Sequence, residues 1–134
     1  MKNPKQNSER WLKESDSTFR QAKRNCEERA YNLACFLAEQ AAQKALKAVL
    51  YLDGARFINI HSIRELLNEA LKKHKEFLEL VEAGTKLDQY YLSTRYPDAV
   101  PEPAVPSEIF AKSQAEEAVE IAGKIFEACR QLII

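Results

Sequence analysis

A cluster of aromatic residues around one arginine is the part of this sequence best suited to chemistry. Tyr90 and Tyr91 precede Arg95 and Tyr96, and a proline-rich segment follows directly. Aromatic rings stack on planar groups such as a nucleobase, and a guanidinium forms forked hydrogen bonds to a phosphate. The same residue types are common in the centres of protein interfaces. The cluster therefore predicts either a nucleotide-binding site or a surface that docks another protein.

A second candidate is a group of polar residues on an otherwise apolar segment. Its members are Glu39, Gln40, Gln43, Lys44 and Lys47. On a helix this spacing places the residues in one stripe. The stripe is either a solvated network of i, i+4 pairs or a site where Lys44 and Lys47 bind a phosphate. A glycine-rich phosphate loop is not available, because the only glycines are Gly54, Gly84 and Gly123. A bound phosphate would therefore be held by side chains.

A third candidate pairs Arg56 with His61, which follows five residues later. A histidine can act as a general acid or base, and an arginine can stabilise a phosphorane. A structural interpretation is also open: Ser62 and Glu65 match a helix capping box, so His61 stands just before the cap and would pack against Leu66. Two isolated histidines do not give the spacing of a metal site, and no metal or cofactor is expected.

The segment at residues 31–52 must position these groups, because it is the longest apolar run in the chain. Its twenty-two residues contain neither glycine nor proline, and most favour helix. Small residues recur at spacings of three or four, at Ala30, Ala34, Ala38, Ala41, Ala45 and Ala48. Such a seam lets other helices approach closely. We expect this helix to occupy the middle of a bundle.

The rest of the chain supplies the surrounding helices. Long helices are predicted at about residues 8–25, 62–84 and 107–132. The first would be capped by Asn7 or Ser8. Gly84 would end the helix at residues 62–84 as a left-handed residue, and a kink or break near Lys73-His74-Lys75 of that helix stays open. Thr85 and Asp88 repeat the capping pattern before a short helix that carries Tyr90 and Tyr91, and a loop with four prolines follows at residues 93–106. The predicted fold class is all-α, an up-and-down bundle of four long helices and one short helix in a single domain over residues 1–134.

Composition agrees with this class and limits the partners. The 134 residues suffice for one core, and 20 basic against 20 acidic residues give no surplus for general nucleic-acid binding. The three cysteines are odd in number and form no CxxC pair, as expected of free thiols in a reducing cytoplasm. The predicted central helix carries the charged residues Glu39, Lys44 and Lys47 within its apolar run, so no membrane partner is expected.

Three stretches together resemble the HEPN domain family. They are YNLACFLAEQAAQKALKAVL at residues 31–50, His61-Ser62 followed by Leu66-Leu67, and TRYPDA at residues 94–99. The resemblance covers about residues 11–132. It implies an α-helical bundle that is usually a homodimer, often partnered with a minimal nucleotidyltransferase in a two-component system of the toxin–antitoxin kind.

On this resemblance the main interpretation is a non-catalytic HEPN protein that binds a nucleotide, a minimal nucleotidyltransferase, or both. The expected roles are phosphate binding for Lys44, Lys47 and Arg95, base stacking for Tyr90, Tyr91 or Tyr96, and a hydrogen bond from His61.

Two other classes of function stay open. One branch of the family consists of metal-independent ribonucleases with an arginine, four to six residues and a histidine in a late helix. Arg56 and His61 match that spacing, although they precede the third predicted helix, and RNA would then be the substrate. The third class is a purely structural bundle whose tyrosine-rich surface docks another chain.

Overall fold

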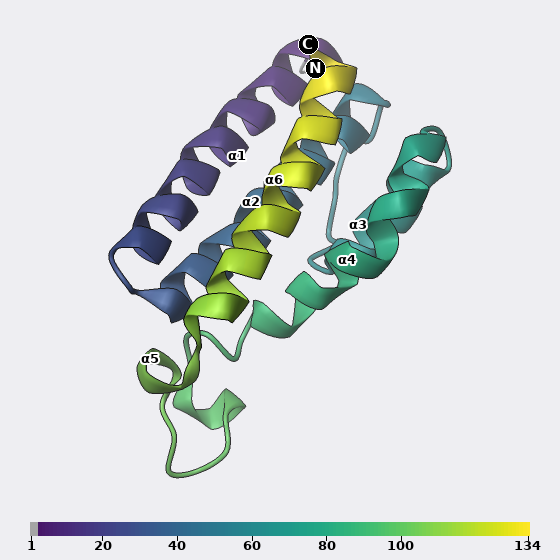
Figure 1. Cartoon of the computed structure of the whole chain (residues 1–134). Coiled ribbons are helices and arrows are strands. Elements are labelled where there is room, and N and C mark those ends of the chain that lie inside the picture. Colours follow the sequence, from purple (N-terminus) through teal and green to yellow (C-terminus); the bar gives the residue numbers. More distant parts are fainter. Residues whose placement is uncertain (1–2) are drawn as a thin grey trace.

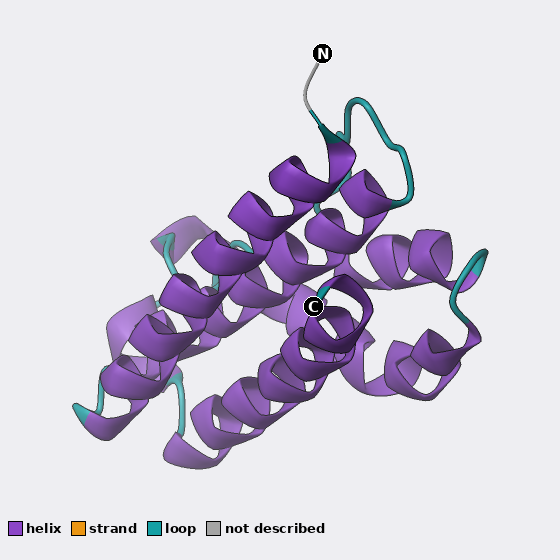
Figure 2. Ribbon diagram, turned by 90° about the horizontal axis from the view of Figure 1, so that it is seen from above, coloured by secondary structure: helices purple, strands orange, loops and turns teal. Residues whose placement is uncertain are grey.

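The computed structural model describes residues 3–134, which form helices and loops without any strand (Figures 1 and 2). Three long helices run side by side: α1 (Pro4–Glu27), α2 (Tyr31–Leu52) and α6 (Lys112–Ile133). The chain turns back between α1 and α2, so these two helices are antiparallel, and α6 ends near the start of α1 (Figure 1). The predicted all-α bundle is confirmed.

Shorter helices complete the bundle. The α-helical ones are α3 (Ile63–Leu71), α4 (Val81–Thr85) and α5 (Pro106–Ile109), and the 3-10 helices are η1 (Lys75–Leu80), η2 (Lys86–Tyr90) and η3 (Pro97–Ala99). The predicted bounds of the central helix are confirmed by α2. None of the helices in the described range combines the length and the apolar character needed to cross a membrane.

α1 begins earlier than the sequence predicted. The side chain of Asn3 accepts hydrogen bonds from the backbone nitrogens of Lys5 (2.9 Å) and Gln6 (3.2 Å), and Pro4 occupies the first helical turn, where its missing N–H costs nothing. The predicted cap at Asn7 or Ser8 is therefore wrong. Both residues are buried inside the helix, and the Ser8 hydroxyl donates to the Ala48 carbonyl of α2 at 2.7 Å.

The alanine seam of α2 forms the centre of the core, as expected. Ala34, Ala38, Ala41, Ala45 and Ala48 are all fully buried, and α1 and α6 pack against this helix. Small side chains allow the backbones to approach, and the approach is close enough for hydroxyl groups to bridge two helices. The Ser15 hydroxyl donates to the Ala41 carbonyl at 2.7 Å. This bond lies about two helical turns along the seam from the one made by Ser8.

The predicted helix at residues 62–84 is interrupted near Lys73-His74-Lys75, where the sequence left a kink or break open. α3 ends at Leu71, a turn follows, and the chain continues through η1 and α4. The break is fixed by contacts with Asp53 at the end of α2, because His74 Nε2 lies 2.9 Å from a carboxylate oxygen of Asp53 and Lys73 Nζ donates to the Asp53 carbonyl at 3.0 Å.

The left-handed stop predicted at Gly84 is wrong. This residue is buried in α4, where a Cβ atom would lie 2.5 Å from Leu67 Cδ1.

The last long helix starts later than predicted. Pro106–Ile109 form the separate helix α5, and the backbone is extended at Phe110 and Ala111 before α6 begins at Lys112. The Gln114 side chain then accepts a hydrogen bond from the Ala111 nitrogen at 2.9 Å, which satisfies one free donor of the helix start.

Candidate functional site

Arg95 lies at the centre of an aromatic cluster formed by two segments that are distant in the sequence. Its guanidinium carbon is 4.2 Å from the ring centroid of Phe36 in α2, and 5.3 Å and 4.9 Å from those of Tyr91 and Tyr96. Each such contact contributes roughly 0.5–2 kcal/mol, depending on solvent exposure. The cation is therefore held between rings and keeps a fixed position at the surface. We call Phe36, His61, Tyr91, Arg95 and Tyr96 the arginine–aromatic cluster.

The hydrogen bonds of Arg95 hold it without using all its donors. Nε and Nη2 both donate to the Tyr91 carbonyl, at 3.2 Å and 2.6 Å. The Nη1 amino group has no hydrogen-bond partner among residues 3–134. A neighbouring bond ties this segment to α2, since Asn32 Nδ2 donates to the Thr94 carbonyl at 3.0 Å. The guanidinium is thus positioned by the protein and still has N–H groups for an anion.

His61 joins the cluster by stacking on Tyr91, with ring centroids 5.9 Å apart and planes inclined by 13°. Asp88 of η2 fixes this arrangement because its carboxylate accepts from Ser62 Oγ (3.1 Å) and from the backbone nitrogens of Ile63 (2.6 Å) and Arg64 (3.2 Å). A carboxylate is well placed at a helix N-terminus, where free N–H groups carry partial positive charge. His61 therefore lies on Tyr91. Its packing against Leu66 stays a prediction.

The capping predictions around this point have mixed outcomes. The Ser62 side chain accepts from the Glu65 nitrogen at 3.2 Å, so the predicted cap residue of α3 is confirmed. The capping pattern predicted for Thr85 and Asp88 is wrong. Thr85 Oγ1 donates back to the Val81 carbonyl at 2.7 Å, while Asp88 caps α3 instead of its own helix.

A buried carboxylate lies on α2 close to the cluster. Glu39 is fully buried, and its two oxygens accept from Gln43 Nε2 (2.5 Å) and Gln40 Nε2 (2.8 Å). Burial raises the pKa of Glu39 to about 7, although the two hydrogen bonds lower it. The negative charge of Asp88 also raises this pKa, and the positive charge of Arg95 lowers it. The helix that supplies Phe36 to the cluster thus also carries an acid whose pKa is near neutral.

Three of the predicted site residues lie outside the cluster. Lys44 turns toward α1, where Nζ donates to Thr18 Oγ1 at 2.9 Å and pairs with Glu14 at 3.5 Å. Lys47 is buried, with Nζ 5.9 Å from the ring centroid of Trp11, and burial lowers its pKa. Tyr90 is buried against Phe110, with ring centroids 5.9 Å apart, so it offers no free ring face.

The predicted solvated stripe is wrong for Glu39, Gln43 and Lys47, which are all buried.

Comparison with known proteins assigns the family. The model of the HEPN domain matches residues 8–132, which is nearly the whole chain. The chain belongs to the HEPN domain family. No curated protein matches the sequence significantly.

Three solved structures resemble this one closely. The protein TT1696 of Thermus thermophilus is 35% identical, with a TM-score of 0.82 over 92% of this chain and 96% of that one. ST0689, described as an archaeal HEPN homologue, is 30% identical, with a TM-score of 0.77 over the full length of both chains. A HEPN domain protein of Thermotoga maritima is 29% identical, with a TM-score of 0.71 over 92% of this chain and 96% of that one.

Within this HEPN fold, Arg56 and His61 make separate contacts. Arg56 is exposed and lines a cavity with Trp11 and Tyr51, whereas His61 stacks on Tyr91. The residues between them are not helical. The ribonuclease pair was expected to act from one helix, so the observed placement gives that alternative no support.

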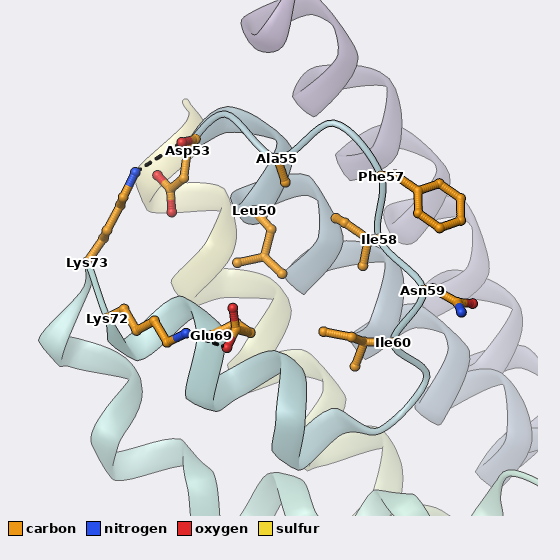
Figure 3. A pocket seen from close by; sticks show the side chains of 10 residues that line it. All are labelled: Leu50, Asp53, Ala55, Phe57, Ile58, Asn59, Ile60, Glu69, Lys72 and Lys73. Atoms are coloured by element: carbon orange, nitrogen blue, oxygen red, sulfur yellow. Dashed lines mark hydrogen bonds and ion pairs between the residues drawn. The ribbon is translucent and has the colours of Figure 1, made fainter.

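A cavity of about 450 Å³ at the end of α2 offers less chemistry than the cluster (Figure 3). Leu50, Ile58 and Ile60 line its apolar side, while the ring of Phe57 points away from them (Figure 3). Its lysines are already engaged, because Lys72 pairs with Glu69 at 2.8 Å and Lys73 donates to Asp53. The arginine–aromatic cluster is therefore the better candidate site.

Proposed function

We propose that this chain is a non-catalytic HEPN protein that binds a nucleotide at the arginine–aromatic cluster. The observation that carries the proposal is the position of Arg95, whose guanidinium is fixed between three rings and keeps free N–H groups. A cation that does not have to be ordered on binding loses little side-chain entropy, which favours affinity.

The geometry supports separate roles for the cluster residues. The phosphate groups contact the free N–H groups of Arg95 and the imidazole of His61, which is exposed beside it on Tyr91. The base stacks on Tyr96, whose side chain is 51% exposed. Since side chains alone hold the phosphate, we expect modest affinity and no requirement for a glycine-rich loop.

Glu39 gives this binding a dependence on pH. The Gln40 and Gln43 amides hold the Glu39 carboxyl, whose pKa responds to the charge of Arg95, so ionisation of Glu39 partly cancels the positive potential that a phosphate meets. Nucleotide affinity of the wild-type protein should therefore fall, relative to that of E39Q, as the pH rises through about 7. The comparison with E39Q removes the contribution of the phosphate's own titration.

A thermal-shift titration tests the proposal. ATP, GTP, CTP and UTP are each added to the purified protein with and without magnesium. A ligand at a hundred times its Kd stabilises the fold by about 2.7 kcal/mol, so modest affinity is visible at millimolar concentration. The proposal expects at least one nucleotide to raise Tm; no shift with any of the four would contradict it and favour the purely structural class.

The proposal also pairs the chain with a minimal nucleotidyltransferase, in a two-component system in the cytoplasm, and with a second copy of itself. Large apolar side chains support a docking surface, since Phe57 is 81% and Leu78 67% exposed. Light scattering on the purified protein should give the mass of a dimer, and co-expression with a neighbouring nucleotidyltransferase should give a complex. A monomeric mass together with no complex on co-expression would contradict the proposed assembly, but not the proposed nucleotide binding.

A further inference from the structure

The loop that joins α2 to α3 forms one wall of the cavity at the end of α2. Residues 57–62 of this loop adopt no regular secondary structure, but exposure alternates along them: Ile58 and Ile60 are half-buried, whereas Phe57 and Asn59 are exposed. A period of two is typical of an extended chain, in which successive side chains point to opposite sides. The loop therefore presents two branched apolar side chains on one side, and both line the cavity.

The apolar wall continues onto α2 and is accessible to a small molecule. Leu50 of α2 lines the cavity together with Ile58 and Ile60, and the ring of Phe57 points away from them, so it does not cover this surface (Figure 3). The volume of about 450 Å³ lies within the usual range of small-molecule sites, which is about 300–1,000 Å³. An apolar ligand gains affinity by leaving water for such a surface.

The two carboxylates of the lining already have partners. Glu69 of α3 pairs with Lys72 at 2.8 Å. The carboxylate oxygens of Asp53 lie 3.0 Å and 2.9 Å from His74 Nε2. Because both acidic groups are satisfied within the protein, the lining does not select a cationic ligand.

Lys73 differs from these groups because its partner is uncharged. Its Nζ donates to the Asp53 carbonyl at 3.0 Å, and it forms no ion pair with any residue from 3 to 134. An ammonium group has three donors, so this bond leaves others for a ligand. A cation without a counter-charge on the rim of an apolar cavity matches an apolar molecule that carries one negative charge.

We propose that this cavity binds a small amphipathic monocarboxylate, a molecule with an apolar body and a single carboxylate group. The apolar body packs against Leu50, Ile58 and Ile60, and the carboxylate accepts hydrogen bonds from Lys73. None of these residues takes part in the proposed nucleotide binding at Arg95, so the two proposals are tested separately.

A titration with octanoate, followed by NMR on the isotope-labelled full chain, tests this proposal. The amide signals of residues 55–60 and 72–73 should shift in a saturable way. Hexanoate and butanoate should bind more weakly, by up to about fourfold for each methylene group that is no longer buried. Octanamide and octylammonium, which lack the negative charge, should bind at least about tenfold more weakly than octanoate.

Variants of Lys73 test its role directly. K73M keeps an apolar stem but removes the ammonium group, and should weaken octanoate binding about tenfold, whereas K73R should retain most of the affinity. K124A removes an exposed lysine of α6 that pairs with Glu120, and it should leave the affinity unchanged. R95A should also leave it unchanged.

Four results would overturn the proposal. They are the absence of a saturable shift with octanoate, an unchanged affinity in K73M, equal affinities for octanoate and octanamide, and a loss of binding in R95A. The last result would assign the carboxylate to the arginine–aromatic cluster. If K73M does not fold, the comparison of octanoate with octanamide on the wild-type protein decides.

Discussion

Replacing Glu39 with glutamine removes a buried charge and nearly preserves the shape of the side chain. Because the folded-state pKa is raised from 4.5 to about 7, the folded protein holds the Glu39 proton more tightly than the unfolded chain does. The associated stability is complete below pH 4.5 and is lost as the pH rises through about 7. At roughly 1.4 kcal/mol per unit of pKa, the wild-type protein should lose about 3 kcal/mol over this range.

E39Q should not show this loss. Glutamine is neutral at every pH in the range, and the neighbouring Gln40 and Gln43 amides can turn to offer it donors and acceptors. The free energy of unfolding is measured with urea from about pH 5 to about pH 9 for both proteins. As the pH rises, the free energy of unfolding of E39Q should increase by about 3 kcal/mol relative to that of the wild type.

The control for this experiment is E9Q, which removes an exposed carboxylate from α1. It should follow the wild-type protein at every pH. A difference between E39Q and the wild type that stays constant across the range would refute the reasoning, because Glu39 would then titrate alike in the folded and unfolded states.

Two further substitutions test how the structure positions the site. D88A removes three hydrogen bonds from the start of α3 and should cost about 1–2 kcal/mol of stability. It should also weaken nucleotide binding, because Asp88 positions His61. D98A, at an exposed position of η3, should have neither effect, and equal effects of the two variants would contradict the role of Asp88. G84A places a Cβ atom 2.5 Å from Leu67 Cδ1 and should cost about 1–3 kcal/mol, measured by thermal unfolding. G123A meets only the edge of Phe19 at 3.1 Å and should cost less; the reverse order would contradict the packing at Gly84.

Much of the fold could be predicted from local signals. A run of twenty-two helix-forming residues without glycine or proline gave the bounds of α2, and its alanines indicated the core. The start of α1 was missed although its signal is present, because Asn3-Pro4 is a typical cap followed by proline. The turn between α1 and α2 had no such signal, since Arg29 adopts the left-handed conformation (φ 66°) that glycine usually takes.

The break after α3 was expected near Lys73-His74-Lys75 only as one option, because no local signal decides it. Residues 63–83 contain neither glycine nor proline, and the interruption depends on contacts of Lys73 and His74 with Asp53, the residue that follows α2. Tertiary contacts of this kind override helix propensity.

The candidate site was predicted where its residues are sequence neighbours. Tyr91, Arg95 and Tyr96 lie within six positions, so composition alone indicated them. Phe36 was missed as a member because α2 brings it there only in the folded chain, and Glu39 was placed on a solvated stripe, not at a buried position of that helix. For Glu39, the available signal was a carboxylate on an otherwise apolar helix, four residues before the amide of Gln43.

The orientation of Lys44 and Lys47 depends on which helices flank α2. Both lysines lie on the polar stripe of that helix, as predicted, but α1 covers this part of it. The stripe alone does not tell which of its residues face solvent and which face Thr18 or Trp11.

The most direct test of nucleotide binding at Arg95 is a calorimetric titration of the nucleotide that gives the largest thermal shift. It is performed on the wild-type protein, on R95A, and on R20A, which removes an exposed arginine that pairs with Asp16 on the surface of α1. Binding by the wild type and R20A with the same Kd, and at least tenfold weaker binding by R95A, is the predicted result. Equal affinity of R95A and the wild type would contradict it.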